Sequence, residues 1–377
     1  MIYLDSAATT LQKPSAVARA AGLAVNNLSS PGRGGHAASV RAAEAAFECR
    51  ALAAGLLGVG DASNVVFTHS ATHGLNIAIK SLVRPGSRVL ISGYEHNAVT
   101  RPLHAIGANV TIAASELFEP EMALHAFESR LMGGLSAVIC NHVSNVFGYI
   151  LPIERIAAAC REYRVPLIID ASQSAGMLPV DFTKLGAVFM AMPGHKGLYG
   201  PQGTGLLLCA GAPDAIIHGG TGSDSKLPGM PDFLPDRLEA GTHNMPGIAG
   251  LYAGLKFVQK KGVESILEHE RGLIEKAAGG LMRLDGVTVF KSEFGYCQTG
   301  VLSFLIDGMT CETAAHELAR RGIAVRAGMH CAPLAHRSAG TYETGTIRIS
   351  VSVFNTRWEI GVFVGAVEDI VRSMGKR

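Results

Sequence analysis

Apolar and polar residues alternate along residues 14–250 in two distinct patterns. Short apolar runs, several of them rich in Val and Ile, are separated by longer stretches in which apolar residues have helical spacing. Strands that alternate with helices in this way are typical of an α/β domain with a mainly parallel sheet. The apolar runs lie at 65–67, 88–91, 110–112, 137–140, 166–169, 187–191 and 205–208. The helical stretches include 39–57, 74–82, 118–131 and 153–163.

The pattern changes after about residue 250. Long helical stretches there lead into apolar runs and further helices, which predicts a smaller α+β domain. We therefore expect a large domain over 14–250 and a small C-terminal domain over 251–377, with residues 1–13 packed near the small domain. The expected helices lie at 245–261, 263–283, 311–321 and 356–374. The expected strands lie at 286–290, 299–305, 323–326 and 345–350.

Four strands of the large domain are followed by polar residues. These are the segments 68–70, 93–96 and 141–145, and Asp170 after the run 166–169. In parallel α/β sheets, ligands bind at the carboxyl ends of the strands. Polar side chains at four such ends predict a ligand site at this edge of the sheet.

The charges of the chain are nearly balanced, with 33 basic and 31 acidic residues and a net charge of +2. This balance gives no electrostatic basis for binding nucleic acid or an anionic membrane. No apolar run reaches the roughly 18 residues that a membrane helix needs. The first residues lack the basic and apolar regions of a signal peptide, so that we expect a cytoplasmic protein.

Seven cysteines are scattered along the chain, and no two of them have C-x-x-C spacing. Their number and spacing predict neither a disulfide framework nor a zinc site, and we expect no metal. Four lie in apolar runs typical of buried cysteines, at 49, 140, 160 and 209. Cys331 differs, because its neighbours Gly328 and His330 belong to a polar, turn-prone segment.

A glycine-rich loop over 193–205 contains Lys196 directly after a predicted strand. A lysine in this setting binds phosphate as a point charge, forms a Schiff base with a carbonyl compound, or is a solvated surface residue. A Walker A loop is excluded, because Gly197 follows the lysine where that motif has Ser or Thr. The segment alone leaves the three interpretations open.

Asp170 ends the buried run 167–169 and precedes Lys196 by 26 residues. A carboxylate at this place either caps a helix or pairs with the pyridine nitrogen of pyridoxal phosphate (PLP). The second role keeps the ring protonated, so that it works as an electron sink. The combination with Lys196 favours the second interpretation.

Three further features carry candidate chemistry. The turn 70–74 follows a strand and begins a helix, which is typical of an anion site. His96, after another strand, is either a residue that stacks on a ring or a structural residue. Arg348 lies inside an apolar strand and needs a carboxylate, which either an amino-acid substrate or an internal salt bridge supplies.

Taken together, these segments resemble the class V aminotransferase superfamily, and within it the cysteine desulfurases with a short cysteine loop. The resemblance runs along nearly the whole chain, in the order expected for the family. The matching segments are 3–10, 32–36, 95–99, 143–148, 170–173, 194–196, 239–244, 326–331 and Arg348.

The resemblance implies fold type I of the PLP enzymes and a homodimer with active sites at the subunit interface. It implies L-cysteine or selenocysteine as the substrate and a separate sulfur-acceptor protein. Lys196, Cys331 and His96 would be the catalytic residues: Lys196 would hold PLP, Cys331 would take the sulfur, and His96 would stack on the ring. The other implied cofactor contacts are Ala71, Thr72, Asn145, Asp170, Gln173, His195 and Thr242 of the partner subunit. The implied substrate contacts are Asn145, Arg348 and His36.

Two positions depart from the family pattern. Pro193 stands where many relatives have a Ser that contacts the phosphate, and His73 stands where an acidic residue is common. Because Pro has neither an N–H nor a hydroxyl group, phosphate binding would depend more on the turn 70–74 and His195.

Other functions also fit the sequence. On the same fold, the alternatives are a selenocysteine lyase, a β-lyase acting on cysteine or cystine, and an amino-acid epimerase. A PLP-binding protein without turnover and a nucleotide-binding α/β protein are alternatives from other classes.

Overall fold

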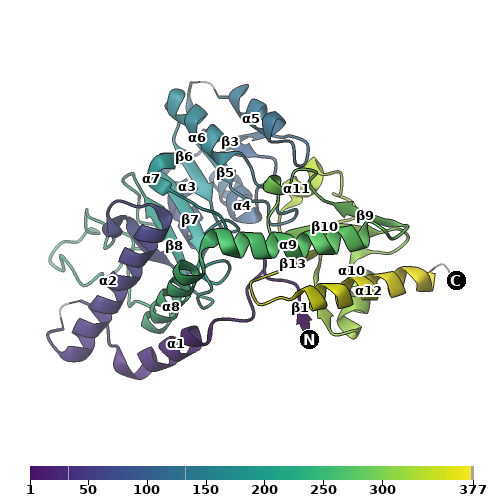
Figure 1. Ribbon diagram of the computed structural model, residues 1–377. Helices are drawn as coiled ribbons and strands as arrows, with labels where there is room; N and C mark the ends of the chain where they lie inside the picture. Colours follow the sequence, from purple (N-terminus) through teal and green to yellow (C-terminus); the bar gives the residue numbers. More distant parts are fainter. Residues whose placement is uncertain (33, 132, 375–377) are drawn as a thin grey trace.

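The computed structural model describes residues 1–32, 34–131 and 133–374. Within these residues, a seven-stranded sheet is formed by strands between residues 65 and 209, and a four-stranded sheet by strands between residues 287 and 350 (Figure 1). The long helix α9 (Val263–Leu281) runs from the neighbourhood of the larger sheet along the smaller one.

The seven-stranded sheet has the order β2–β8–β7–β6–β5–β3–β4. The strands from β7 to β4 are parallel, whereas β8 runs antiparallel to both of its neighbours. The expected α/β fold with a mainly parallel sheet is therefore confirmed. The strands are β2 (Val65–Thr68), β3 (Arg88–Ser92), β4 (Asn109–Ala113), β5 (Leu135–Asn141), β6 (Leu167–Asp170), β7 (Phe189–Pro193) and β8 (Gly205–Cys209).

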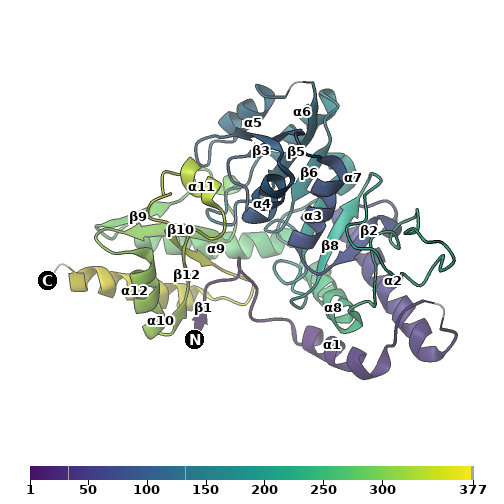
Figure 2. The same cartoon turned by 180° about the vertical axis from the view of Figure 1, so that it is seen from behind.

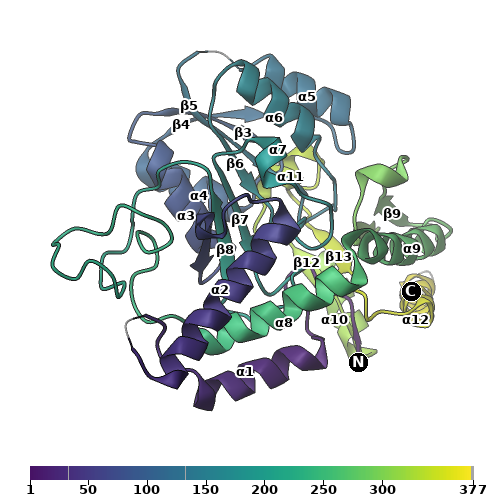
Figure 3. The same ribbon diagram turned by 60° about the vertical axis from the view of Figure 1, so that its left-hand side comes forward.

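Helices cover both faces of this sheet. Successive strand residues point to opposite faces, so that Val138 packs under one helical layer and Ile139 under the other. Because both faces are buried, the strands appear in the sequence as continuous apolar runs. Figure 2 shows α3 and α4 on one face, and Figure 3 shows α8 on the other with α1 beside it. The helices of this part are α1 (Ser15–Asn27), α2 (Ala37–Leu57), α3 (Ala71–Leu82), α4 (Asn97–Ile106), α5 (Pro120–Glu128), α6 (Ile153–Glu162), α7 (Phe182–Leu185) and α8 (Met245–Lys261).

The four-stranded sheet is antiparallel, with the order β12–β13–β10–β9. Helices α9, α10 and α12 bury its core, to which Leu4 from the N-terminal segment contributes. The short strand β1 (Ile2–Tyr3) pairs in parallel with β11 (Ile323–Ala324). The remaining elements are β9 (Val287–Phe290), β10 (Val301–Ile306), α10 (Cys311–Arg320), β12 (Arg326–Gly328), α11 (Pro333–Ser338), β13 (Thr346–Ser350) and α12 (Arg357–Met374).

Some element predictions were wrong. The single strand expected at 323–326 is two short strands, since β11 pairs with β1 and β12 pairs with β13. The helix expected at 118–131 is shorter, because Phe118 has φ +64° and the helix begins only at Pro120. The domain boundary expected at residue 250 falls within the continuous helix α8, and the division into two domains stays a prediction. None of the helices in the described ranges is both long and apolar enough to cross a membrane.

Candidate active site

The carboxyl ends of the parallel strands meet at one cavity. Asn141 ends β5, Asp170 ends β6 and Pro193 ends β7, and all three line this cavity. The start of α3 and the start of α4 complete it. Eight of the predicted site residues lie around it: Ala71, Thr72, His96, Asn145, Asp170, Gln173, His195 and Lys196.

Lys196 is a partly buried amine that lines this cavity. Burial lowers the pKa of Lys196 to about 8, although the carboxylate of Asp170 acts in the opposite direction. Near neutral pH, a much larger fraction of this lysine is therefore the nucleophilic free base than of an exposed lysine. Of the three interpretations of Lys196, a solvated surface residue does not fit this partly buried position in the cavity.

Asp170 is almost fully buried at the end of β6. Its Oδ1 accepts a hydrogen bond from the Ser172 N–H at 2.9 Å. This bond resembles a cap, but it uses one carboxylate oxygen and leaves the other for a donor in the cavity. The ring N–H of a pyridinium is such a donor.

The start of α3 supplies the anion site that the turn 70–74 predicts. Ser70 caps the helix, and its Oγ accepts from His73 N–H at 3.2 Å. The helix begins at Ala71, three residues before the predicted start, and the N–H groups of Ala71 and Thr72 precede the first helical hydrogen bond, which Gly74 N–H donates to Ser70. These N–H groups can therefore bind a phosphate in the cavity.

His195 and His96 line the same cavity as neutral imidazoles. Burial, with Lys196 and Lys13 nearby, lowers the pKa of His195 to about 4. Burial also lowers the pKa of His96. His96 Nδ1 accepts from Ala98 N–H at 3.0 Å, so that the ring of the neutral form has its proton on Nε2.

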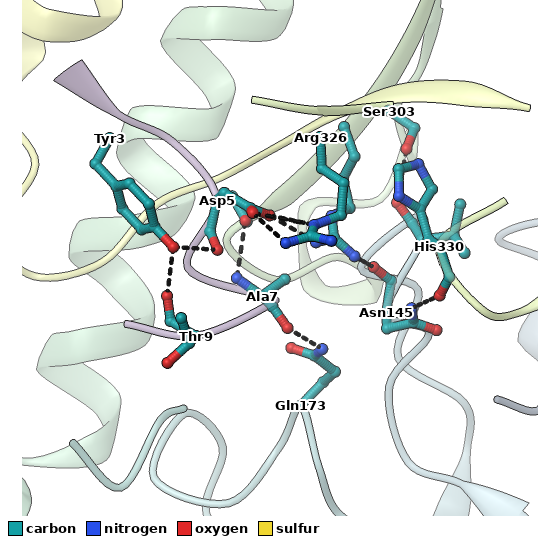
Figure 4. Close-up of polar contacts among 12 residues, drawn as sticks. Tyr3, Asp5, Ala7, Thr9, Asn145, Gln173, Ser303, Arg326 and His330 are labelled. Carbon is teal, nitrogen blue, oxygen red and sulfur yellow. Dashed lines mark hydrogen bonds and ion pairs between the residues drawn. The ribbon is translucent and has the colours of Figure 1, made fainter. Parts of the chain in front are cut away.

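Arg348 is buried on β13, where it makes an internal salt bridge. Its Nη2 lies 2.9 Å from Asp5 Oδ1, and its Nη1 donates to the backbone oxygen of Asn145 at 2.7 Å. Asp5 also binds Arg326, and Figure 4 shows Asp5, on the N-terminal segment, beside that arginine. Arg348 Nε is buried and has no partner among the described residues. The salt-bridge alternative is therefore present, and one buried donor remains for another acceptor.

Gln173 links the cavity to the N-terminal segment. Its Nε2 donates to the backbone oxygen of Ala7 at 2.9 Å, as Figure 4 shows. The side-chain oxygen of Gln173 is not used in this bond. The predicted contact of Gln173 with a ring hydroxyl therefore depends on its oxygen.

The Cys331 loop is held by hydrogen bonds to both of its central carbonyls. Asn145 Nδ2 donates to His330 O at 2.8 Å, and the Asn97 N–H donates to Cys331 O at 2.7 Å. Both loop residues have positive φ, +47° for His330 and +56° for Cys331, a conformation that residues with a side chain rarely adopt. Cys331 is exposed, whereas the other cysteines are buried, as expected for Cys49, Cys140, Cys160 and Cys209.

Four predicted residues do not line this cavity: Arg348 and Cys331, described above, and Thr242 and His36. Thr242 is exposed and lines a separate pocket with His69 and His73. His36 is exposed and caps α2. Arg33, which belongs to the same predicted loop as His36, lies outside the described residues. The roles of Thr242 and His36 stay predictions. Thr242 would act on the cofactor of the other subunit.

Sequence reasoning gave no role to several residues of the site. Asp5, which binds Arg348 and Arg326, belongs to a matched segment but carries no local signal of this pairing. Glu95 is fully buried beneath the site, and its Oε1 accepts from Ser92 Oγ at 2.6 Å and from Asn141 N–H at 2.8 Å. Burial raises the pKa of Glu95 to about 8. In the sequence, the position of Glu95 after a predicted strand was the indication that it belongs to the site.

Comparisons with known proteins agree with this geometry. The family model of class-V aminotransferases matches residues 2–363. A probable cysteine desulfurase of Methanothermobacter thermautotrophicus is 30% identical, over 98% of this chain and 94% of the relative. A probable cysteine desulfurase of Mycolicibacterium paratuberculosis is 33% identical over 98% of this chain, which spans only 55% of that relative.

Solved structures give the same result. The apo structure of a cysteine desulfurase from Thermococcus onnurineus has a TM-score of 0.90 and 28% identity, over 99% of this chain and 95% of that one. A cysteine desulfurase from Escherichia coli, in an S-sulfonic acid form, has a TM-score of 0.87 and 27% identity over 99% and 94%.

The chain belongs to the class-V aminotransferases, a family of PLP-dependent enzymes. Relatives and structural neighbours that it matches over nearly their full length bear the names probable cysteine desulfurase and cysteine desulfurase, and the chain is an enzyme of this class.

Proposed function

We propose that this chain binds PLP at Lys196 and removes sulfur from L-cysteine, which leaves L-alanine and a persulfide on Cys331. The observation that carries the proposal is a partly buried lysine that shares a cavity with Asp170 and with Asn145, whose amide holds the Cys331 loop. A desulfurase needs these groups together: an amine for the cofactor, a carboxylate for its ring nitrogen and an accessible thiol.

The proposed phosphate site combines backbone and side-chain donors. The free N–H groups of Ala71 and Thr72 point along the start of α3, where the helix dipole favours an anion. His195 adds a neutral imidazole, which Thr9 Oγ1 contacts at 3.0 Å. Pro193 lines the same cavity without offering a donor, so that these groups take the place of the missing hydroxyl.

The proposed ring site uses Asp170, His96 and Gln173. Asp170 receives the ring N–H, His96 stacks on the ring, and Gln173 offers its side-chain oxygen to the ring hydroxyl. When bound, PLP supplies the electron sink that weakens bonds at Cα and Cβ of the substrate. Lys196 exchanges a proton at the substrate Cα, for which a pKa of about 8 is suitable near neutral pH.

Sulfur transfer is the role of the Cys331 thiolate. As the thiolate attacks the substrate sulfur, an S–S bond forms and the Cβ–S bond breaks. The electron pair of the broken bond stays with the carbon skeleton, which gains protons and leaves as L-alanine. A thiol of a reductant or of an acceptor protein then attacks the persulfide and takes the sulfur.

We also propose a homodimer in which the partner's Thr242 completes the phosphate site, and His36 contacts the substrate. Exposed apolar side chains on α1 and α2, among them Leu23 and Phe47, support an interface there. Light scattering gives the oligomeric state. Thr242→Ala is expected to weaken PLP retention in the dimer.

The function is tested by incubating the PLP-loaded protein with L-cysteine and a thiol reductant, and measuring alanine and sulfide together. Equal amounts of both products are expected from the wild type, and almost none from Cys331→Ala. Cys160→Ala is the matched control, because Cys160 is buried on α6 and does not line the cavity. Mass spectrometry without reductant should find one additional sulfur atom on Cys331.

Other products would change the assignment. Pyruvate and ammonia in place of alanine would identify a β-lyase, and a racemised amino acid an epimerase. If the wild type releases nothing from cysteine but alanine from selenocysteine, the protein is a selenocysteine lyase. No product from any of these substrates would leave a PLP-binding protein without turnover.

A further inference from the structure

A carboxyl group that none of the steps above uses lies behind the active-site lysine. Glu270 is in the middle of α9, with only 1% of its surface exposed. Both of its carboxyl oxygens are buried, and neither makes a hydrogen bond to any described residue. Most buried carboxylates in proteins are paired or hydrogen-bonded, so that this one requires an explanation.

The charge state of Glu270 follows from its surroundings. With no cation or hydrogen bond to offset it, burial raises the pKa of Glu270 well above its usual value. A raised pKa favours the neutral carboxylic acid, which has one O–H donor and free acceptor positions.

A small cavity lies in front of this carboxyl, and Lys196 lines its other side. Its volume is about 20 Å³ for the centres of water molecules, and roughly 10–15 Å³ is enough for one water. Thr10, Gln173 and Ser350 add polar groups to its wall, so that a water there finds several partners. Lys196 and Gln173 also line the main cavity, and Lys196 thus stands between the two.

The room for the carboxyl depends on Gly300. A Cβ added at Gly300 would overlap Glu270 Oε2. No side chain fits there without moving the carboxyl.

The other titratable groups that face Glu270 are few. Tyr199 lines the same cavity, and burial, followed by the nearby Glu270, raises the pKa of its hydroxyl above the usual value. Tyr199 therefore stays neutral, and its Oη accepts from the Val353 N–H at 3.3 Å. Among the groups that line this cavity, Lys196 is the partner whose charge changes near neutral pH.

We propose that Glu270 is a positioning residue that exchanges a proton with Lys196 through water in this cavity; this rests on the proposed function. When the Lys196 amine needs a proton, the Glu270 O–H gives one to the water, and the water gives one of its own to Nζ. The products are a carboxylate and an ammonium ion, and the reverse transfer restores the neutral pair. No bond between heavy atoms forms or breaks.

The test compares Glu270→Gln with Glu268→Gln in the PLP-loaded protein. Gln keeps the size and a hydrogen-bond donor but has no acidic proton, and Glu268 is an exposed carboxylate on the same helix. We expect E270Q to lose an infrared band of a protonated carboxyl group that E268Q retains. We also expect kcat for alanine formation from L-cysteine to fall about tenfold in E270Q, with a changed pH profile and an altered solvent isotope effect.

Each possible result of this comparison either supports or contradicts the proton exchange between Glu270 and Lys196. If E270Q retains every protonated-carboxyl band of the wild type, Glu270 is ionised and the proposal is wrong. If the band disappears but kcat and its pH profile equal those of E268Q, Glu270 is a structural acid and does not exchange protons with Lys196. If the wild type makes no alanine at all, the proposed function fails, while the infrared result still reports the charge of Glu270.

The proposal can also be tested if E270Q does not fold. In the wild type, L-cysteine should shift the Glu270 band, because Lys196 changes its charge and its hydrogen bonds during turnover. Labelling the Glu carboxyl groups with ¹³C assigns the bands to Glu, and Glu95→Gln identifies the band of Glu95, whose pKa is also raised. A carboxyl band that stays unchanged on addition of L-cysteine would contradict the exchange.

Discussion

Replacing Glu239 with alanine should destabilise the protein strongly, because it leaves a buried arginine without its counter-ion. Glu239 and Arg50 are each 8% exposed and form a bidentate pair, in which Arg50 Nη1 donates to Glu239 Oε1 at 2.7 Å. Glu239 also accepts from the Phe67 N–H at 2.6 Å and lies 2.6 Å from His243 Nε2. Breaking a buried pair of this kind costs about 3–5 kcal/mol.

The assay is urea denaturation at fixed protein and PLP concentrations. Glu121→Ala is the control, because Glu121 makes a similar bidentate pair with Arg155 at the exposed surface and should leave the free energy of unfolding nearly unchanged. The double variant R50M/E239L should recover much of the loss, since no charge is then left buried. A loss below about 1 kcal/mol for E239A would refute the reasoning.

The pH dependence gives an independent check on this pair. Burial opposes the ionisation of Glu239, but the hydrogen bond from His243 and the charge of Arg50 outweigh it, so that the pKa of Glu239 is lowered. A lowered pKa contributes stability that is present above the usual pKa of Glu and is lost as the pH falls through the folded-state value. E239A should therefore differ most from the wild type near neutral pH and least in acid.

Three further changes test the site. Glu270→Gln should become more stable relative to the wild type as the pH rises from about 5 to 7. The reason is that the raised pKa of Glu270 makes the wild type take up a proton on folding, which costs more free energy as the pH rises. The difference in the free energy of unfolding, measured by urea denaturation, should grow by up to about 1.4 kcal/mol per pH unit. Arg348→Lys should raise KM for L-cysteine about tenfold while PLP is retained. A lysine ammonium lacks the planar guanidinium fork, which can bind a carboxylate and Asn145 O at the same time. An unchanged KM would show that Arg348 does not bind the substrate. Asn145→Ala should reduce the amount of persulfide on Cys331, measured by mass spectrometry, because it removes the hydrogen bond to the His330 carbonyl. An unchanged amount of persulfide would show that the loop does not need this hydrogen bond.

Much of the fold could be predicted from hydrophobic patterning, for a physical reason. Strands that are buried on both faces give uninterrupted apolar runs, and each strand of the seven-stranded sheet overlaps one of the predicted runs. Helix α4 was not predicted, because it has Pro102 in its interior and begins at a capping His96 rather than at a common cap residue. The antiparallel direction of β8 could not be predicted, since an apolar run carries no information on direction.

The site could be predicted where local sequence defines it. Asp170 and Lys196 follow strands, and the structure places them around one cavity. The pairing of Asp5 with Arg348 joins residues 343 positions apart, and no local pattern encodes such a contact. The same holds for Glu270, which in the sequence is one of several acidic residues on an amphipathic helix and is distinguished only by its burial.

Asn145 connects the parts of the site that a desulfurase must coordinate. Its side chain holds the His330 carbonyl beside Cys331, and its backbone oxygen receives Arg348 Nη1. Arg348 in turn binds Asp5. A substrate carboxylate that binds Arg348 would therefore act on the same residue that fixes the sulfur-accepting loop. In the proposed reaction, this loop is held in a rarely adopted conformation by hydrogen bonds, so that we expect the sulfur acceptor to come to Cys331 rather than the thiol to move out.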